Sequence, residues 1–410
     1  MEIKLPEYVE GILNTLNNNN YCAYVVGGCV RDCIMGIEPH DWDITTDATP
    51  EEVEKLFAIS YPTGKKYGTI TVGWINEQLG DEYHCEVTTF RVDGNYSDGR
   101  RPDSVTFGKD IIEDLSRRDF TINAMAYNSI VGLIDQYDGK NDIQNKIIRC
   151  VEDPKERFNE DALRILRAIR FACKFNFEID ELTLDAIRDK YNLIFNNISK
   201  ERINDELIKI LKYASKENKD IFSFTNFLWK KLFGLPISGC TEIYNTSLNV
   251  NQKLYSIFLF CNYSLADIEI WLRKYKFSNK DVIQIINLVK IYNKHLANTH
   301  VNIINTTNYI VRCMMKDFSI EDLNLFYNVC NKFKNFKEAF NREKNMPCKI
   351  EHLDINGNDI QREFNIQEGK AIGIILNKCL DAVIKNPILN MKEELIKFIK
   401  TNLNLVELKS

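Results

Sequence analysis

The pattern of apolar and polar residues divides the chain into two parts with different periods. Up to about residue 140, short β-branched runs alternate with turn residues, which predicts strands at "AYVV", "WDITT", "GTITVGWI", "YHCEVTTFRV" and "DSVTFG". "VRDCIM" predicts a helical turn that closes at Gly36. "TPEEVEKL" predicts a helix with a capping box, because Thr can cap it and Pro fits its first turn. We also expect "RRDFTINAMAYN" to be a helix that begins at Asp119.

From about Asp153 onward, apolar residues recur at three- and four-residue spacing, which is typical of amphipathic helices. The clearest helical segments are "RFNEDALRILRAIRFACKFNF", "LTLDAIRDKYNLI" and "SKERINDELIKILKYAS". The longest apolar runs are far too short to span a membrane. The two patterns together predict an α+β protein, with a mixed-sheet head followed by an all-α remainder.

Length and composition place the chain among multidomain globular proteins. Its 410 residues are too many for one core, so two to four domains are expected. The start "MEIKLPEYVEG" is acidic and lacks an apolar signal segment. The 12 cysteines have no CxxC spacing, and there are five histidines. We interpret the cysteines as reduced, mostly buried thiols of a cytoplasmic protein, not as zinc ligands or disulfides.

The net charge of −5 conceals an uneven distribution. Residues 1–150 carry 14 Lys and Arg against 25 Asp and Glu, whereas residues 151–410 carry 39 against 33. An acidic N-terminal part suits a metal site, and a basic C-terminal part suits a surface that binds a polyanion such as nucleic acid. The alternative is that the basic residues are the solvated faces of ordinary helices.

Two carboxylates stand one residue apart in "GGCVRDCIMGIEPHDWDITT". In a strand, residues two apart point to the same face about 6.6 Å from each other, so Asp41 and Asp43 would lie side by side. Trp42 would then point into the core. Paired hard oxygen ligands suit Mg²⁺, although a lone Asp-x-Asp also occurs often by chance at turns and surfaces.

The residues on either side of this pair extend the interpretation. The turn at Gly27-Gly28 leads into a helix start, which with Arg31 beside it offers free N–H groups to an anion. Glu86 in "CEVTTF" supplies a third carboxylate, which would be costly to bury alone. The sequence therefore predicts a phosphate site next to a metal site.

This combination resembles the head domain of the nucleotidyltransferase superfamily that includes DNA polymerase β. "GGCVRDCIMGIEPHDWDITT", "DLSRRDFTINAMAYN", "RFNEDALRILRAIRF" and "SKERINDEL" follow the order and spacing seen in bacterial tRNA nucleotidyltransferases, the CCA-adding enzymes, and in the related bacterial poly(A) polymerases. The resemblance implies a catalytic head at residues 1–140 and a nucleotide-selecting helical neck at 141–215. A helical body at 216–300 and a tRNA-binding helical tail at 301–410 would complete the chain.

The same resemblance assigns roles to individual residues. It implies that Asp41 and Asp43 hold Mg²⁺ and act in catalysis, with Glu86 as a third catalytic carboxylate. It implies nucleotide binding by Gly28, Arg31, Arg118, Asp119, Asp161, Arg164, Arg167 and Arg170.

Asp161 and Arg164 suggest how the nucleotide is chosen. Three apart in a predicted helix, they are neighbours on one face, which alone would indicate an ordinary surface ion pair. Cytosine and adenine, however, both present an amine donor beside a ring-nitrogen acceptor, and uracil and guanine present the reverse. A carboxylate beside a guanidinium complements the first pair and opposes the second. We expect Arg167 and Arg170 to face the triphosphate or to hold this reading pair in place.

The implied activity is template-independent addition of C, C and A to the 3′ end of tRNA from CTP and ATP, with release of diphosphate. The protein would act in the cytoplasm, as a monomer or homodimer, bind the acceptor arm and elbow of tRNA, and bind no membrane. A CC-adding enzyme, a poly(A) polymerase and a non-catalytic RNA-binding relative are the alternatives. The loop "VDGNYSDGRRPD", with Gly99 and Arg100-Arg101, favours CCA addition, because CC-adding relatives have a shortened loop.

Overall fold

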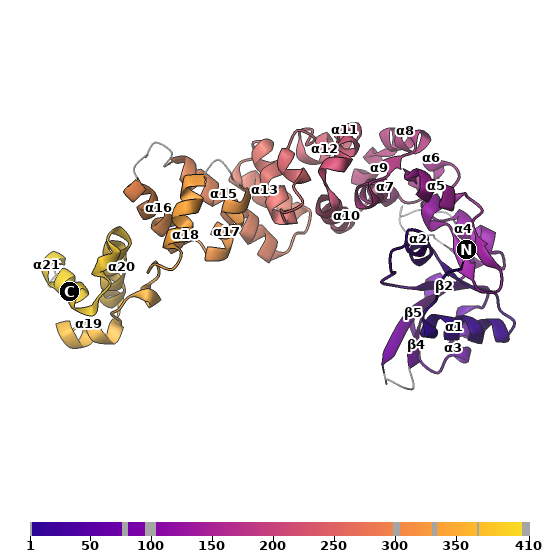
Figure 1. Ribbon diagram of the computed structural model, residues 1–410, viewed down its shortest axis with the longest axis horizontal. Helices are drawn as coiled ribbons and strands as arrows, with labels where there is room; N and C mark the ends of the chain where they lie inside the picture. The colour runs from indigo at the N-terminus through magenta and orange to yellow at the C-terminus, as the bar shows by residue number, and fades with distance from the viewer. Residues whose placement is uncertain are drawn as a thin grey trace. The chain divides into compact units, whose positions relative to one another are not determined.

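The structure is a computed structural model that describes residues 2–75, 81–94, 104–297, 304–329, 334–366 and 369–403. The loop that carries Gly99, Arg100 and Arg101 lies outside the described residues. The chain divides into unit 1 (Met1–Thr246 with Lys274–Lys276) and unit 2 (Ser247–Arg273 with Phe277–Ser410). Unit 1 combines a sheet with helices and unit 2 is helical, which confirms the α+β prediction (Figure 1). The division into four domains stays a prediction.

A seven-stranded mixed sheet forms the centre of the first half of unit 1, in the order β3-β4-β5-β2-β1-β8-β9. Its strands are β1 (Ala23–Val26), β2 (Asp43–Thr46), β3 (Ser60–Gly64), β4 (Thr69–Ile75), β5 (Glu82–Thr89), β8 (Ala126–Asn128) and β9 (Gly132–Ile134). The neighbours β2 and β5 are parallel, whereas the other neighbouring strands are antiparallel. Every residue of β1 is buried, so its continuous apolar run fits a strand near the middle of the sheet.

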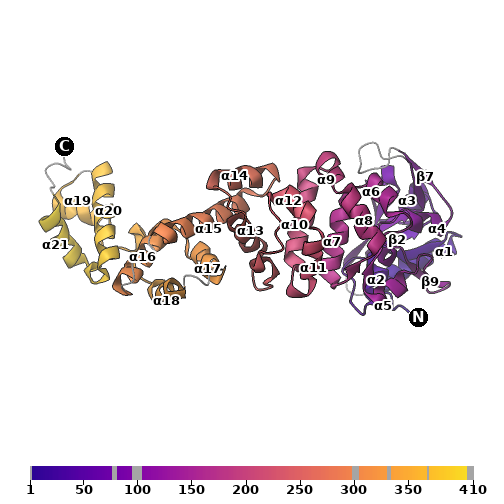
Figure 2. The same cartoon turned by 90° about the horizontal axis from the view of Figure 1, so that it is seen from above.

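Helices pack beside the strands of this sheet, and they predominate in unit 1 after residue 150. The α-helices of unit 1 are α1 (Glu7–Asn18), α2 (Gly28–Ile34), α3 (Pro50–Leu56), α4 (Ile111–Ser116), α5 (Gly139–Asn145), α6 (Pro154–Glu160), α7 (Leu163–Phe175), α8 (Glu181–Lys190), α9 (Asn192–Asn197), α10 (Lys200–Tyr213), α11 (Lys219–Phe224) and α12 (Asn226–Phe233). Short 3₁₀ turns are η1 (Lys65–Tyr67), η2 (Thr121–Asn123), η3 (Lys216–Asn218) and η4 (Thr241–Tyr244). Two small ladders pair β6 (Arg91–Asp93) with β7 (Val105–Phe107), and β10 (Ile147–Ile148) with β11 (Glu178–Ile179). Helices α1 and α3 lie beside β4 (Figure 1), and α7 packs along α10 (Figure 2).

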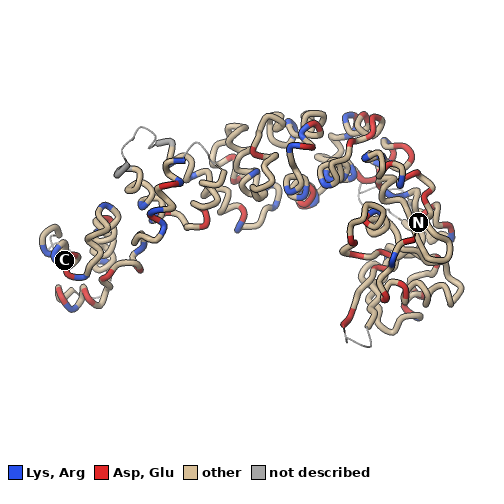
Figure 3. The backbone as a smooth tube through the Cα atoms, viewed as in Figure 1, with Lys and Arg blue, Asp and Glu red and all other residues tan. Residues whose placement is uncertain are grey.

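The chain after Thr246 is built from helices. They are α13 (Val250–Phe260), α14 (Leu265–Lys274), α15 (Asn279–Ala297), α16 (Ile304–Asp317), α17 (Ile320–Val329), α18 (Lys334–Glu343), η6 (Ile350–His352), α19 (Gly357–Phe364), α20 (Lys370–Lys385), η7 (Pro387–Leu389) and α21 (Lys392–Asn402). Basic and acidic residues are interspersed along these helices (Figure 3). Among the described residues, no helix has the length and apolar character needed to cross a membrane.

Several local predictions are confirmed. Thr49 and Glu52 form the expected capping box of α3, and Gly36 has the positive φ of 71° expected where α2 ends. Trp42 is buried. Seven of the 11 described cysteines are buried and all 11 are free thiols, which fits the expectation of reduced, mostly buried cysteines.

Two predicted helices are wrong. "RRDFTINAMAYN" is not a helix from Asp119, because Ala126–Asn128 pairs with β1 as strand β8 and leaves only the 3₁₀ turn η2 before it. "RFNEDALRILRAIRF" is not one helix, because α6 ends at Glu160 and Asp161 has an extended backbone. The Oδ1 atom of Asp161 accepts the backbone N–H of Leu163 at 2.9 Å, which starts α7 as a new helix.

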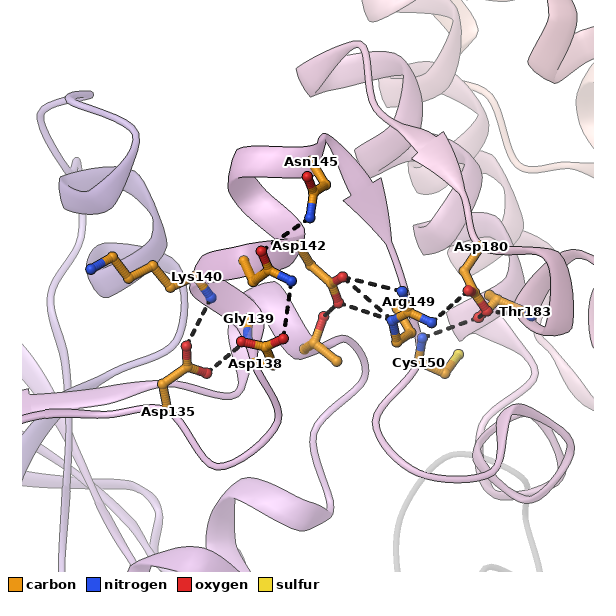
Figure 4. A network of polar contacts seen from close by, with 12 residues as sticks. Asp135, Asp138, Gly139, Lys140, Asp142, Asn145, Arg149, Cys150, Asp180 and Thr183 are labelled. Atoms are coloured by element: carbon orange, nitrogen blue, oxygen red, sulfur yellow. Dashed lines mark hydrogen bonds and ion pairs between the residues drawn. The ribbon is translucent and has the colours of Figure 1, made fainter.

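A polar network ties turn η2 to the helices that follow (Figure 4). The buried Asp142 accepts hydrogen bonds from the Thr121 hydroxyl at 2.6 Å and from Arg149 Nε at 3.1 Å. Arg149 Nη1 donates in turn to Asp180, the N-cap of α8, at 2.6 Å. Because Thr121 lies two residues after Asp119, these bonds fix the segment that carries the predicted site residue Asp119.

Gly139 makes this arrangement possible, and its replacement should destabilise the fold. An added Cβ would lie 2.2 Å from the carbonyl oxygen of Thr121, a backbone atom with little freedom to move. We expect Gly139→Ala to lower the free energy of unfolding by about 3 kcal/mol, as overpacking does. Urea denaturation measures this change in the free energy of unfolding. Gly373→Ala, where an added Cβ meets nothing within 4 Å, is the control and should keep or slightly raise stability. Equal stability of the two variants would contradict the expectation.

Candidate active site

A cleft of about 660 Å³ in unit 1 collects most of the predicted site residues. This volume is within the range of small-molecule sites. The cleft is lined by Gly27, Gly28, Arg31, Asp41, Asp43, Arg117, Arg118, Asp119, Asn123, Asp161, Leu163, Arg164, Arg167, Arg170, Phe171, Lys174 and Arg202. Eight of these residues are basic and four are acidic, so the cleft is strongly cationic although the first 150 residues are acidic overall. Such a surface attracts polyanionic ligands.

The predicted carboxylates meet at the sheet. Asp43 begins β2 and pairs in register with Glu86 on the parallel strand β5. Asp41 precedes the strand and does not lie within it, which corrects the prediction that both belong to β2. Desolvation by the surrounding protein raises the pKa of Asp43 even though its side chain opens to the cleft, and Glu86 and Asp41 raise that pKa further, against the opposing effect of Arg118. Glu86 is not part of the cleft lining.

These carboxylates lack internal partners. Within the described residues, the side chains of Asp41, Asp43 and Glu86 have no hydrogen bond or ion pair. The charges of Glu86 and Asp41 disfavour the ionised form of Asp43, and Arg118 acts in the opposite direction. The arrangement is therefore suited to a positive ligand.

Arg118 also lines the cleft. The buried Asp114 fixes it, accepting from Arg118 Nη2 at 3.2 Å and from Arg117 Nη2 at 2.6 Å. Gly27 has a φ of 81°, and a Cβ there would come within 2.9 Å of Arg118 Nη1. Arg118 Nε is buried and has no hydrogen-bond partner among the described residues.

Asp119 connects turn η2 to helix α7 through hydrogen bonds. It accepts hydrogen bonds from the N–H of Phe120 at 2.9 Å, from Asn123 Nδ2 at 3.0 Å, and from Arg167 Nε at 2.8 Å. Burial alone would raise the pKa of Asp119, but Arg167 and Asn123 outweigh it and hold this pKa at about 2. Asp119 is thus a structural partner of Arg167 and caps no α-helix.

This pKa predicts an acid-sensitive contribution to stability. A carboxyl with a folded pKa near 2 against an ordinary 3.8 stabilises the fold above pH 4 and loses that effect as the pH falls toward 2. We expect Asp119→Asn to lower the free energy of unfolding by about 2 kcal/mol at pH 7 and by much less at pH 2. Denaturation experiments at pH 7 and pH 2 measure the free energy of unfolding of the variant and of the wild type. The control is Asp185→Asn, which breaks an exposed ion pair with Arg188 and should cost little. A loss that is the same at both pH values would contradict the assignment.

Asp161 and Arg164 both line the cleft, but they do not contact each other as predicted. Asp161 lies in the break between α6 and α7, and its Oδ2 accepts from Arg202 Nη2 of α10 at 2.7 Å. Arg164 instead donates to Glu160. The two side chains therefore do not pair with each other as neighbours on one helix face would.

Backbone groups hold Arg164 in the cleft. Its Nη1 donates to the carbonyl of Arg157 at 3.1 Å, and its Nη2 donates to the carbonyl of Arg117 at 2.9 Å. Together with the bond to Glu160, this uses three of five guanidinium donors and leaves Nε and one Nη2 hydrogen. Arg164 as a residue is 9% exposed, so the orientation of its side chain is fixed by the fold.

The guanidinium groups of three predicted arginines lie close to the ring of Phe171. The guanidinium carbon of Arg170 lies 4.1 Å from the ring centroid, that of Arg31 5.4 Å and that of Arg167 5.5 Å. Arg31 also donates to Asp32 at 2.6 Å and to Asn123 Oδ1 at 2.5 Å. The ring offsets part of the repulsion among these cations and connects α2 of the head to α7.

The sequence interpretation missed several residues of the cleft. Asn123 and Arg202 lie within motifs that were quoted, "RRDFTIN" and "SKERINDEL", but their partners are distant in sequence. Phe171 and Lys174 extend the three-residue series of arginines on α7 by one turn. Their helical spacing was the signal that could have identified them.

Comparison with known proteins agrees with this architecture. Residues 23–149 match the family model for a Poly A polymerase head domain, and residues 176–217 match one for an RNA and SrmB-binding site of polymerase A. Residues 247–399 match the model for tRNA nucleotidyltransferase domain 2.

Full-length relatives extend these matches over the whole chain. The CCA-adding enzyme of Lactococcus lactis subsp. cremoris is 32% identical, over 98% of this chain and 98% of the relative. That of Staphylococcus aureus is 33% identical, over 99% of this chain and 100% of the relative. The crystal structure of the Bacillus stearothermophilus CCA-adding enzyme in complex with CTP superposes with a TM-score of 0.75 at 26% identity and covers 98% of both chains. The chain belongs to the family of CCA-adding enzymes.

Proposed function

We propose that this protein adds C, C and A to the 3′ end of tRNA, using CTP and ATP and releasing diphosphate, without a nucleic-acid template. The observation that carries the proposal is the cleft itself, which joins the carboxylate pair Asp41 and Asp43 to the polar residues Asp161 and Arg164. The first pair suits chemistry at a phosphate, and the second suits recognition of a base. The cytoplasm is the expected place of this reaction.

The carboxylates fit a divalent cation, and we propose Mg²⁺. Asp41 and Asp43 would hold it, with Glu86 as a supporting carboxylate. Among the described residues, no three His, Cys, Asp or Glu side chains form a metal site by themselves. That fits Mg²⁺, which is usually held by one or two carboxylates together with substrate phosphates and water. When bound, the ion would stabilise negative charge at the reacting phosphate and activate the RNA 3′-hydroxyl.

The remaining residues would orient the triphosphate. Arg118 lines the cleft and is anchored by Asp114, so it can contact a phosphate without reorganising. Gly28 and Arg31 lie at the start of α2 in the same cleft. Arg31 is tied to Asp32 and Asn123, so we propose that it contributes mainly by its charge. Arg167 and Arg170, fixed by Asp119 and Glu206, would complete the cationic wall.

Asp161 and Arg164 would read the base. Both carboxylate oxygens of Asp161 keep acceptor capacity beside the bonds from Leu163 and Arg202, and can accept the exocyclic amine of cytosine or adenine. The free donors of Arg164 can serve the neighbouring ring nitrogen. Because both side chains are held by other residues, the site is preorganised, and a mismatched base would leave its polar groups unpaired.

The experiment that tests the proposal uses purified protein, Mg²⁺ and a tRNA transcript that lacks its 3′ CCA. Products are resolved at single-nucleotide steps with CTP alone, ATP alone, and both. Two additions with CTP and three with the mixture, followed by a stop, are expected. A stop at two in the mixture would indicate a CC-adding enzyme, and long ladders with ATP alone a poly(A) polymerase. No extension would indicate a non-catalytic RNA-binding protein.

A further inference from the structure

The cations of the cleft differ in how they are neutralised. Seven of the eight are arginines, and each has a carboxylate partner: Arg31 has Asp32, Arg117 and Arg118 have Asp114, Arg164 has Glu160, Arg167 has Asp119, Arg170 has Glu206 and Arg202 has Asp161. The eighth is Lys174. Within the described part of the chain, its ammonium has no ion pair and no hydrogen bond.

Lys174 is nevertheless held in a defined place. It lies in the last turn of α7, one turn beyond Arg170 and on the same side, and its Nζ lies 4.8 Å from the ring centroid of Phe175. The rings of Phe175 and Phe171 are stacked, with centroids 5.8 Å apart. The ammonium therefore extends the group of cations that lie around the ring of Phe171.

The surroundings of Lys174 favour an anionic ligand. Desolvation by the surrounding protein lowers the pKa of Lys174 although its side chain is exposed, and the nearby Arg31 and Arg170 lower it further, against the opposing effect of Asp32. Three neighbouring cations with too few carboxylates between them are relieved when a multiply charged anion binds. Lysine, as a compact point charge with three donors, is a common phosphate ligand.

We propose that Lys174 binds the terminal phosphates of the incoming nucleoside triphosphate, and hence the diphosphate that leaves. The inference rests on the proposed function for the identity of the nucleotide. In this arrangement Asp161 and Arg164 read the base at the start of α7, and Lys174 holds the far end of the same substrate at the last turn of that helix. Lys174 is then a binding residue for CTP and ATP alike, because the phosphates are common to both.

An alternative role for Lys174 is stabilisation of α7, since a cation near a helix C-terminus is favourable. The chain contains a matched residue that separates the two roles. Lys212 lies in the last turn of α10, is exposed as Lys174 is, and has its Nζ 5.8 Å from the ring centroid of the next residue, Tyr213. Lys212 is not part of the cleft lining.

The test compares Lys174→Met, Lys174→Arg and Lys212→Met in the full-length protein. We expect Lys174→Met to raise KM for both CTP and ATP, and the inhibition constant of inorganic diphosphate, by about five- to tenfold, with KM for tRNA unchanged. Lys174→Arg should stay within about twofold of the wild type because it keeps the charge. Lys212→Met should match the wild type in all three constants.

Calorimetric titration of inorganic diphosphate with Mg²⁺, in the absence of tRNA, gives a second readout that needs no activity. Weaker binding to Lys174→Met alone supports the proposal. Unchanged nucleotide and diphosphate constants in Lys174→Met would overturn it, as would a change confined to KM for tRNA. A wild-type protein that binds diphosphate through Lys174 but does not extend tRNA would instead overturn the proposed function and leave this inference standing.

Discussion

Asp43→Asn is expected to abolish nucleotide transfer while leaving the fold as stable as before or slightly more stable. Desolvation raises the pKa of Asp43, and the neighbouring Glu86 and Asp41 raise it further, against the opposing effect of Arg118. A raised pKa means that the charged form is unfavourable in the folded protein, so its removal should not destabilise the fold. If Asp43 holds the metal, kcat should nevertheless fall by about 10³-fold or more.

The measurement combines single-turnover extension of tRNA with thermal unfolding. Asp47→Asn is the matched control, because Asp47 follows β2 and is not part of the cleft lining. Among the residues that the structure describes, its side chain accepts one hydrogen bond, from the N–H of Cys22 at 2.7 Å. An Asn side chain can accept the same bond, so activity should be retained. A variant Asp43→Asn that keeps more than about a tenth of the wild-type kcat would contradict a role in metal binding.

Asp161→Asn is expected to remove the selection of bases. The amide keeps the size of the side chain and can still accept the N–H of Leu163, but its NH₂ group can donate to the carbonyl oxygen of uracil. We expect the preference for CTP over UTP, expressed as the ratio of kcat/KM values, to fall by about 100-fold.

Arg202→Met serves as the comparison for Asp161→Asn. It removes the ion pair to Asp161 and leaves the carboxylate itself, so KM for CTP and ATP should rise while the preference over UTP is kept. Kinetics with each nucleotide on the same tRNA distinguish the two effects. If Asp161→Asn keeps the wild-type preference, the base is read elsewhere.

Local signals in the sequence were sufficient for many elements. The capping box at Thr49 and Glu52 involves residues three apart, and the buried run of β1 is continuous, so both could be identified without knowledge of the fold. The same holds for Ser199, which caps α10 as the pattern "SKERINDEL" suggests. Each of these features depends on neighbours within one or two turns.

The errors arose where distant residues decide the local structure. Ala126–Asn128 has helix-compatible composition but becomes a strand because β1, a hundred residues earlier, offers an edge. Asp161 was expected to face Arg164, yet it pairs with Arg202, 41 residues later. The resemblance to a known family supplied most of the site residues. Their partners follow from the tertiary structure alone, as does the absence of an ion pair or hydrogen bond at Lys174 among the described residues.

The central claim is that a site made of protein, with no nucleic-acid template, selects C and A in order. The most direct test incubates tRNA lacking CCA with the protein, Mg²⁺ and equal concentrations of all four nucleoside triphosphates, and sequences the 3′ ends. We predict that nearly all extended molecules end in CCA and go no further. Frequent U or G at the added positions, or tails beyond three nucleotides, would contradict the claim.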